Sequence, residues 1–136
     1  MQLIVGVKGT GKTKAIIEEV NRASKETKGA VICIEHGRKL NYDISSRARL
    51  VDAQEYGIDT ADKLYGFICG MVAGNYDITE LFVDSALKIC GDDVAAFEEF
   101  VVKTSKIADT YKIACIMTAS IDAADLTEKT ASFIRK

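Results

Sequence analysis

The sequence predicts a three-layer α/β/α fold, in which helices cover both faces of a mostly parallel sheet of about five strands. Short apolar runs alternate along the chain with amphipathic segments of helical length. Two of these runs, residues 30–34 and 112–118, are apolar almost throughout, which is typical of strands buried on both faces of a parallel sheet. Parallel neighbours need helical crossovers, so this order of elements favours a sheet covered on both sides.

The elements follow one another without linkers or repeats. Residues 2–5 form the first predicted strand, and Ile16, Val20 and Ala23 then recur at helical spacing as far as Gly29. Beyond the apolar run at residues 30–34, the same reasoning applies to each later segment. We expect a strand at residues 49–52 on one side of the sheet, then a helix that is capped by Asp59 or Thr60 and stops at Gly74 and Asn75. A strand at residues 81–84 and a helix from about Asp92 follow. The last expected elements are a strand at residues 112–118 and an amphipathic helix from about Asp122.

Length and composition indicate one globular unit. The 136 residues suffice for a single hydrophobic core but not for two ordinary domains, so we expect residues 1–136 to form one domain. A hydrophobic content of 48% with a net charge of -2 argues against disorder and against nucleic-acid binding through a basic surface. The four cysteines lack C-x-x-C spacing, so neither a zinc site nor a disulfide framework is predicted. No leader or membrane-spanning run is apparent, and we expect a cytoplasmic protein without membrane insertion.

The strongest local signal is the stretch GVKGTGKT at residues 6–13, which fits the pattern G-x-x-x-x-G-K-[ST] at every fixed position. Glycines let the backbone curl so that successive N–H groups point at one anion. The stretch lies between a predicted strand and a predicted helix, which is the context that a phosphate-binding loop requires. We therefore expect nucleotide contacts from Gly6, Lys8, Gly9, Thr10, Gly11, Lys12 and Thr13.

Within this loop the charged and hydroxyl residues have separate expected roles. Lys12 would reach the β- and γ-phosphates as a catalytic point charge, and Lys8 would attract phosphate from the loop. The Thr13 hydroxyl would bind Mg²⁺ while its helix directs a positive end at the anion. No [NT]-K-x-D sequence follows the later strands, as guanine-specific GTPases require, so ATP with Mg²⁺ is the expected ligand.

Two carboxylates at strand ends complete the predicted site. Asp84 closes the apolar run LFVD, and parallel sheets place ligand sites at the carboxyl ends of their strands, so we expect Asp84 to hold Mg²⁺ together with Thr13. Ser85 follows, at the position where many ATPases have a glutamate that activates water. Glu35 closes the strand after the first helix and is the candidate general base. The alternative for Glu35 is a solvated carboxylate at the end of a strand.

The order of these motifs resembles the RecA-like ATPase core: a phosphate loop, a strand ending ICIEHG, and a strand ending LFVDSA. In recombinases of that family a Glu-His pair ends the second strand and an Asp-Ser pair ends the magnesium-side strand. The resemblance implies the P-loop NTPase fold, with Glu35 as base, Asp84 as magnesium-side carboxylate, and Thr118 or Ser120 as a γ-phosphate sensor. In size and pattern the chain is also similar to trimmed relatives of secretion and pilus-retraction ATPases.

Three functions remain open from the sequence. The leading hypothesis is slow ATP hydrolysis stimulated by a protein partner or by self-assembly, with Arg38, Arg47 or Arg49 as candidates to supply a transition-state charge in trans. The second is a nucleoside or nucleotide kinase, whose acceptor would lie beneath residues 38–49. The third is a non-catalytic switch, in which ATP orders a partner-binding surface; it is motivated by Ser85 standing where a glutamate is common.

Overall fold

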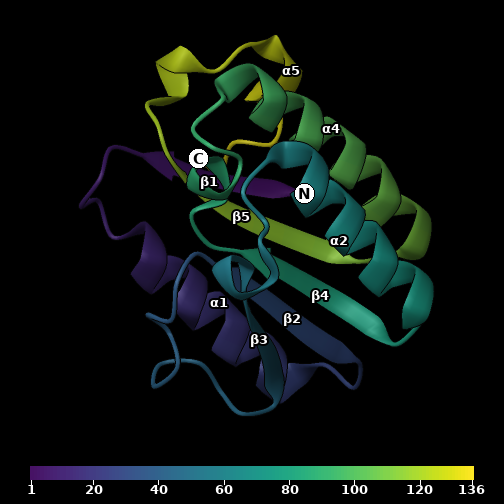
Figure 1. Cartoon of the computed structure of the whole chain (residues 1–136). Helices are drawn as coiled ribbons and strands as arrows, with labels where there is room; N and C mark the ends of the chain where they lie inside the picture. The colour runs from purple at the N-terminus through teal and green to yellow at the C-terminus, as the bar shows by residue number, and fades with distance from the viewer.

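Five parallel strands form the centre of the molecule, in a computed structural model that describes residues 1–136. Their order across the sheet is β1-β5-β4-β2-β3. This arrangement confirms the predicted fold class, a three-layer α/β/α structure around a parallel sheet (Figure 1). The strands are β1 (Gln2–Gly6), β2 (Ala30–Glu35), β3 (Ala48–Asp52), β4 (Ile78–Val83) and β5 (Ala114–Ser120).

The helices divide between the two faces of the sheet. Figure 1 shows α1 on one side, and α2 and α4 packed together on the other. A short α3 follows β4 on the side of α2 and α4, and α5 packs against α4. No helix combines the length and the apolar character that crossing a bilayer would need. The bounds are α1 (Lys12–Glu26), α2 (Ala61–Gly74), α3 (Ala86–Ile89), α4 (Val94–Tyr111) and α5 (Glu128–Ala131).

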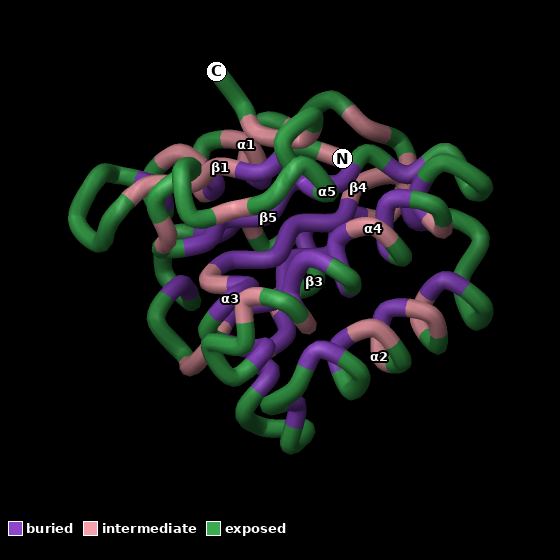
Figure 2. Tube along the Cα trace, turned by 90° about the horizontal axis from the view of Figure 1, so that it is seen from above, coloured by how far each residue is buried: buried purple, intermediate pink, exposed green.

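Two hydrophobic clusters, one on each face, hold the layers together. Successive strand side chains point to opposite faces. In β2, Val31 and Cys33 therefore pack with Ile16 of α1, whereas Ile32 and Ile34 join the larger cluster beneath α2 and α4. The buried residues, purple in Figure 2, accordingly run through the strands and along the inward sides of the helices. Burial on both faces explains why β2 is apolar without alternation.

The chain after β5 differs from its prediction. The amphipathic helix expected from Asp122 is absent; a 3-10 turn (Ala123–Asp125) and the four-residue α5 take its place. The chain then returns to β1, where the Leu3 N–H donates to the Phe133 carbonyl and the Arg135 N–H donates to the Leu3 carbonyl, both at 2.8 Å. Because β1 is an edge strand, its outward backbone groups need partners, and this return supplies them.

Glu98 of α4 anchors this returning segment. Its buried carboxylate accepts hydrogen bonds from the Thr127 N–H at 3.0 Å, the Thr127 hydroxyl at 2.9 Å and the Thr130 hydroxyl at 2.7 Å. Burial acts to raise the pKa of Glu98, but the hydrogen bonds from Thr130 and Thr127 outweigh it, and the pKa lies below its ordinary value. The carboxylate therefore contributes to stability in its charged form.

Replacing Glu98 by alanine is expected to lower the free energy of unfolding by about 1–3 kcal/mol, because donors on Thr127 and Thr130 lose a buried acceptor. Urea unfolding at pH 7 measures this loss. A carboxyl group whose pKa is lowered by folding stabilises the protein at pH values above its unfolded pKa. That contribution disappears as the pH falls through the folded pKa. The difference between wild type and Glu98→Ala should therefore shrink in acid. Glu18→Ala, which removes an exposed carboxylate from α1, is the control. Equal stability of wild type and Glu98→Ala at pH 7 would contradict the anchoring role.

Candidate functional site

The carboxyl ends of β2, β4 and β5 bring three predicted residues side by side. These strands are neighbours in the sheet: Glu35 is the last residue of β2, Asp84 directly follows β4, and Thr118 lies two residues before the end of β5. The Asp84 N–H donates to the Ile34 carbonyl at 2.8 Å, which extends the pairing of β2 and β4 one residue beyond Val83. Asp84 is thus flanked by the other two residues at the sheet edge.

All three side chains belong to the α1 face of the sheet. The residue two positions before each of them packs in the cluster beneath α1; these residues are Cys33, Phe82 and Ile116. Because side-chain direction repeats every two residues along a strand, Glu35, Asp84 and Thr118 share that face. The face is also the one on which α1 begins, at Lys12.

Asp84 is the centre of a small network of oxygen atoms. The buried Thr118 hydroxyl donates to Asp84 Oδ1 at 2.7 Å, and the Thr13 hydroxyl lies 3.4 Å from Oδ1 and 3.5 Å from Oδ2. Ser85 has a φ of 58°, an uncommon conformation for a residue other than glycine, and its N–H donates to the Thr118 hydroxyl at 2.8 Å. The fold therefore brings Thr13 and Asp84 together across 71 positions of sequence.

The segment Gly6 to Thr13, here called the glycine loop, connects β1 to α1. Gly9 and Gly11 have φ values of +88° and +83°, in the left-handed region that favours glycine. Helix α1 has no side-chain cap at its start, so its first N–H groups are available to an anion. Lys12 is largely buried, and its ammonium and the Thr10 hydroxyl both donate to the Val7 carbonyl, each at 2.8 Å.

A cavity of about 430 Å³ lies between the glycine loop and the sheet edge, and we call it the loop cavity. Its lining contains a single carboxylate, Asp92, and a set of lysines, none of which has a carboxylate oxygen within 4.0 Å. Unpaired positive charge in a concave site attracts anions. The lysines are Lys8, Lys12, Lys14, Lys39 and Lys88.

Most of the predicted nucleotide-binding residues line the loop cavity. Gly6 and Thr10 do not, and Gly6 has a packing role instead, since a Cβ at that position would come within 2.8 Å of the Thr10 hydroxyl. Ser120, the alternative to Thr118, is also part of the lining. The predicted residues that line it are Lys8, Gly9, Gly11, Lys12, Thr13 and Thr118.

Sequence reasoning missed three of the cavity lysines. Lys14 directly follows the glycine loop, and its position there is a signal that would have found it. Lys39 follows β2 and Lys88 belongs to α3, and neither lies in a motif. These two residues reach the loop cavity only because the tertiary structure places the carboxyl ends of the strands next to one another.

Glu35 lies beside the loop cavity without lining it. The side chain is 2% exposed, and Oε1 accepts hydrogen bonds from the N–H groups of Lys39 at 2.9 Å and Leu40 at 3.1 Å. Burial raises the pKa of Glu35 above its ordinary value; the two backbone hydrogen bonds oppose this rise, and the nearby charges of Asp52 and Asp84 add to it. The residue is therefore a buried, backbone-bound carboxyl group and not the solvated carboxylate of the alternative interpretation.

The raised pKa of Glu35 predicts a pH dependence of stability. A carboxyl group whose pKa rises on folding stabilises the fold below its unfolded pKa, and this contribution is lost as the pH rises through the folded pKa. Relative to Glu35→Gln, the wild type should therefore lose stability as the pH rises from the ordinary glutamate pKa of about 4.3 through the higher folded pKa. Urea unfolding of both proteins at several pH values measures the difference, with Glu18→Gln as an exposed control. A difference that does not change with pH would contradict the assignment.

The arginines considered as a source of transition-state charge do not line the loop cavity of their own chain. Arg38 lies 3.9 Å from a carboxylate oxygen of Asp52 and 3.6 Å from one of Glu55. An action in trans on a neighbouring chain stays a prediction.

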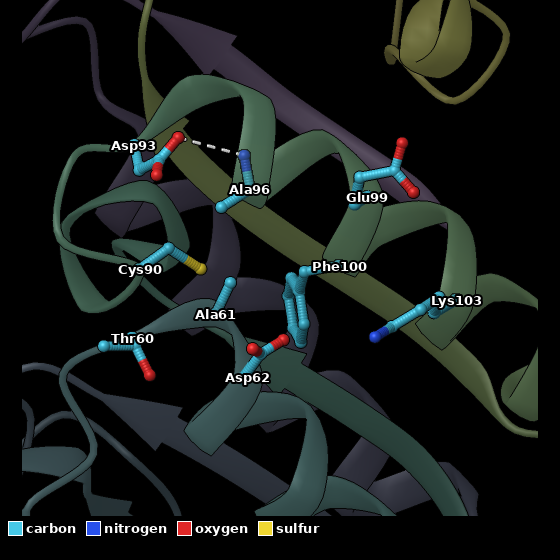
Figure 3. Close-up of a pocket in the computed structure, with 9 residues that line it drawn as sticks. All are labelled: Thr60, Ala61, Asp62, Cys90, Asp93, Ala96, Glu99, Phe100 and Lys103. Atoms are coloured by element: carbon cyan, nitrogen blue, oxygen red, sulfur yellow. Dashed lines mark hydrogen bonds between the residues drawn. The ribbon is translucent and has the colours of Figure 1, made fainter.

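A second cavity, of about 380 Å³, lies between the starts of α2 and α4 (Figure 3). Its polar groups largely serve the fold: Thr60 caps α2, and Asp93 caps α4 through the hydrogen bond drawn in the figure. The Lys103 ammonium lies 4.4 Å from the centre of the Tyr65 ring. Burial raises the pKa of Cys90 to about 12, so its thiol stays protonated at neutral pH. The lining holds one lysine and three carboxylates, Asp62, Asp93 and Glu99, so it lacks the excess of positive charge that distinguishes the loop cavity.

No protein-family model and no curated protein sequence matches this chain. The geometry of the loop cavity is therefore the basis for assigning a function.

Proposed function

We propose that the chain binds ATP with Mg²⁺ in the loop cavity and hydrolyses it slowly until a protein partner or self-assembly stimulates the reaction. The observation that carries this proposal is the convergence of Thr13, Asp84 and Thr118 beneath a glycine loop and five unpaired lysines. A triphosphate would supply the negatively charged partner that these lysines do not have within the chain. The cavity volume of about 430 Å³ also falls within the range of roughly 300–1,000 Å³ that is usual for small-molecule sites.

The glycine loop supplies the phosphate contacts in this proposal. The free N–H groups at the start of α1 and the positive φ values at Gly9 and Gly11 suit a loop wrapped around phosphate oxygens. The Lys12 ammonium is held inside the loop on the Val7 carbonyl, where it can exchange that partner for the β- and γ-phosphates. Lys8 and Lys14 add charge at the rim.

The donor set fits Mg²⁺. The Thr13 hydroxyl and the Asp84 carboxylate are hard oxygen ligands whose atoms lie 3.4 and 3.5 Å apart. No group of three or more His, Cys, Asp or Glu side chains is arranged to hold a metal without help. Mg²⁺ typically binds one or two protein oxygens together with substrate phosphates and water, so such a cluster is not required. Thr13 and Asp84 would hold the Mg²⁺, and its positive charge would offset the negative charge of the phosphates.

The order of strands supports the roles of Asp84 and Thr118. Because β5 lies between β1 and β4, Thr118 stands between the glycine loop and Asp84. Its hydroxyl donates to Asp84 Oδ1 and so orients the carboxylate towards Thr13. Thr118 also lines the loop cavity, where a terminal phosphate would lie.

Slow hydrolysis follows from the state of the candidate base. Ser85 cannot accept a proton at neutral pH, and the Glu35 carboxylate is engaged by two backbone N–H groups. Both backbone hydrogen bonds reach Oε1, so a partner or a second copy that brings Oε2 towards the loop cavity would let Glu35 orient the attacking water while Oε1 still holds the Lys39 backbone. The same engagement favours a second candidate function, a non-catalytic switch in which ATP binding alone changes the surface.

Thermal unfolding with nucleotides tests the proposal. ATP with Mg²⁺ at about 100 times its dissociation constant contributes roughly 2.7 kcal/mol, which corresponds to several degrees in melting temperature. GTP and metal-free ATP are the comparison ligands. A melting temperature that neither ATP nor GTP changes would refute nucleotide binding. Measuring phosphate release then separates the ATPase from the switch, and phosphate transfer to a panel of nucleosides tests the kinase alternative.

A further inference from the structure

We infer that Lys39 binds the γ-phosphate of the nucleotide and that Glu35 positions Lys39 through the backbone of the segment after β2. This inference rests on the proposed function, because it names a contact with the same nucleotide. Lys39 lies outside every motif in the chain and is brought to the loop cavity by the fold alone.

The position of Lys39 indicates that it would contact the terminal phosphate. In a glycine loop of this pattern the backbone N–H groups cradle the α- and β-phosphates, and the metal-side oxygens mark the β- and γ-phosphates. Here those oxygens belong to Thr13 and Asp84. Lys39 follows β2, which lies on the far side of β4 from the loop strand β1. A lysine that enters the cavity from that side meets the end of the phosphate chain that projects beyond the loop.

The ammonium of Lys39 is available for such a contact. It has no carboxylate oxygen within 4.0 Å, although its neighbour Arg38 lies near both Asp52 and Glu55. Arg38 lines a separate hollow of about 160 Å³, whereas Lys39 lines the loop cavity. The segment after β2 thus directs one cation to the acidic hollow and the next cation to the phosphate site.

Two carboxylates hold the backbone that carries Lys39. Glu35 Oε1 accepts from the N–H groups of Lys39 and Leu40, and Asp52 Oδ1 accepts from the Gly37 N–H at 2.9 Å. Leu40 is buried in the cluster beneath α1, and Gly37 turns the chain with a φ of +91°. A lysine placed between fixed neighbours loses less conformational entropy when it binds a ligand than one on a free loop. Glu35 is therefore a positioning residue for Lys39.

Binding measurements with two nucleotides test the role of Lys39. Dissociation constants for ATP and for ADP, each with Mg²⁺, are measured by titration calorimetry for wild type, Lys39→Ala and Lys28→Ala. The control Lys28→Ala removes the same charge from an exposed residue before β2, at the opposite edge of the sheet. We expect Lys39→Ala to weaken ATP binding by about 10- to 100-fold, since one charge-assisted hydrogen bond is lost, with ADP affinity changed by less than about threefold. Lys28→Ala should leave both affinities unchanged.

Variants of Glu35 test its positioning role separately. The side-chain oxygen of Glu35→Gln can still accept from the Lys39 and Leu40 N–H groups, so ATP affinity should stay within about threefold of wild type. Glu35→Ala removes the acceptor and should weaken ATP binding, but not ADP binding, to the level of Lys39→Ala. Combining Glu35→Ala with Lys39→Ala should cause no further loss, because the two residues act through one contact.

The possible results are distinguishable. Equal weakening of ATP and ADP in Lys39→Ala, or no weakening of either, overturns the γ-phosphate contact while leaving nucleotide binding by the wild type in place. Wild-type ATP affinity in Glu35→Ala overturns the positioning role. A wild-type protein that binds neither nucleotide overturns the proposed function and this inference together. If Glu35→Ala fails to fold, Lys39→Ala still decides the phosphate contact, and a loss of ATP affinity of more than about threefold in Glu35→Gln overturns the positioning role, because glutamine keeps the acceptor.

Discussion

Replacing Lys12 by alanine is expected to abolish between about half and about 85% of the rise in melting temperature that ATP with Mg²⁺ produces in the wild type. The Lys12 ammonium lies in the glycine loop, 2.8 Å from the Val7 carbonyl, and has no carboxylate oxygen within 4.0 Å. A charge-assisted hydrogen bond contributes about 1.5–3 kcal/mol, so its loss raises the dissociation constant by at least about tenfold and up to about 100-fold. At a ligand concentration of about 100 times the wild-type dissociation constant, a 100-fold loss lowers the stabilisation from about 2.7 to about 0.4 kcal/mol.

The matched control for this experiment is Lys25→Ala, which removes the same charge from the other end of α1. Its melting temperature should respond to ATP as the wild type does. The melting temperature of each variant without nucleotide shows whether the fold is retained. A shift in Lys12→Ala as large as that in wild type would place the nucleotide, if one binds, somewhere other than the glycine loop.

Glu35→Gln is expected to retain ATP affinity and to lose about 10²- to 10⁴-fold in stimulated turnover, the usual contribution of a positioned general base. Ser85 cannot act as a base at neutral pH, so hydrolysis beyond the background rate needs another carboxylate at this edge of the sheet. Glu35 is adjacent to Asp84 across β2 and β4, and its raised pKa brings it closer to the operating pH of a base. Glutamine preserves the acceptor for the Lys39 and Leu40 N–H groups, so the surrounding backbone should stay in place.

Phosphate release measures this loss in the presence of whichever partner or assembly stimulates the wild type. Glu18→Gln, an exposed substitution on α1, should keep full turnover. Asp84→Ala should differ from Glu35→Gln, because it removes the acceptor near Thr13 and so weakens the magnesium dependence of ATP binding itself. Equal turnover in wild type and Glu35→Gln would exclude Glu35 as the base. Tight ATP binding without turnover in either protein would favour the switch.

The two strands that are buried on both faces, β2 and β5, were the most predictable part of the fold. Residues 30–34 and 112–118 are apolar because helices cover both faces of β2 and β5, and the structure has strands at Ala30–Glu35 and Ala114–Ser120. The weaker candidate at residues 49–52 is also a strand, β3, at the edge of the sheet. The prediction was wrong after β5, where α5 has four residues and hydrogen bonds to Leu3 of β1 replace the expected helix. A pairing between opposite ends of the chain has no local signal.

The candidate site shows the same division. The sequence by itself determined the glycine loop, Lys12, Thr13 and the strand-end position of Asp84, because these depend on spacing within one short segment and on the carboxyl edge of a parallel sheet. Only the tertiary structure decided that β5 separates β1 from β4, that Thr118 orients Asp84, and that Glu35 is a buried acceptor. The same holds for Lys39, since its place in the loop cavity depends on strand order and on hydrogen bonds between segments, and neither has a fixed spacing along the chain.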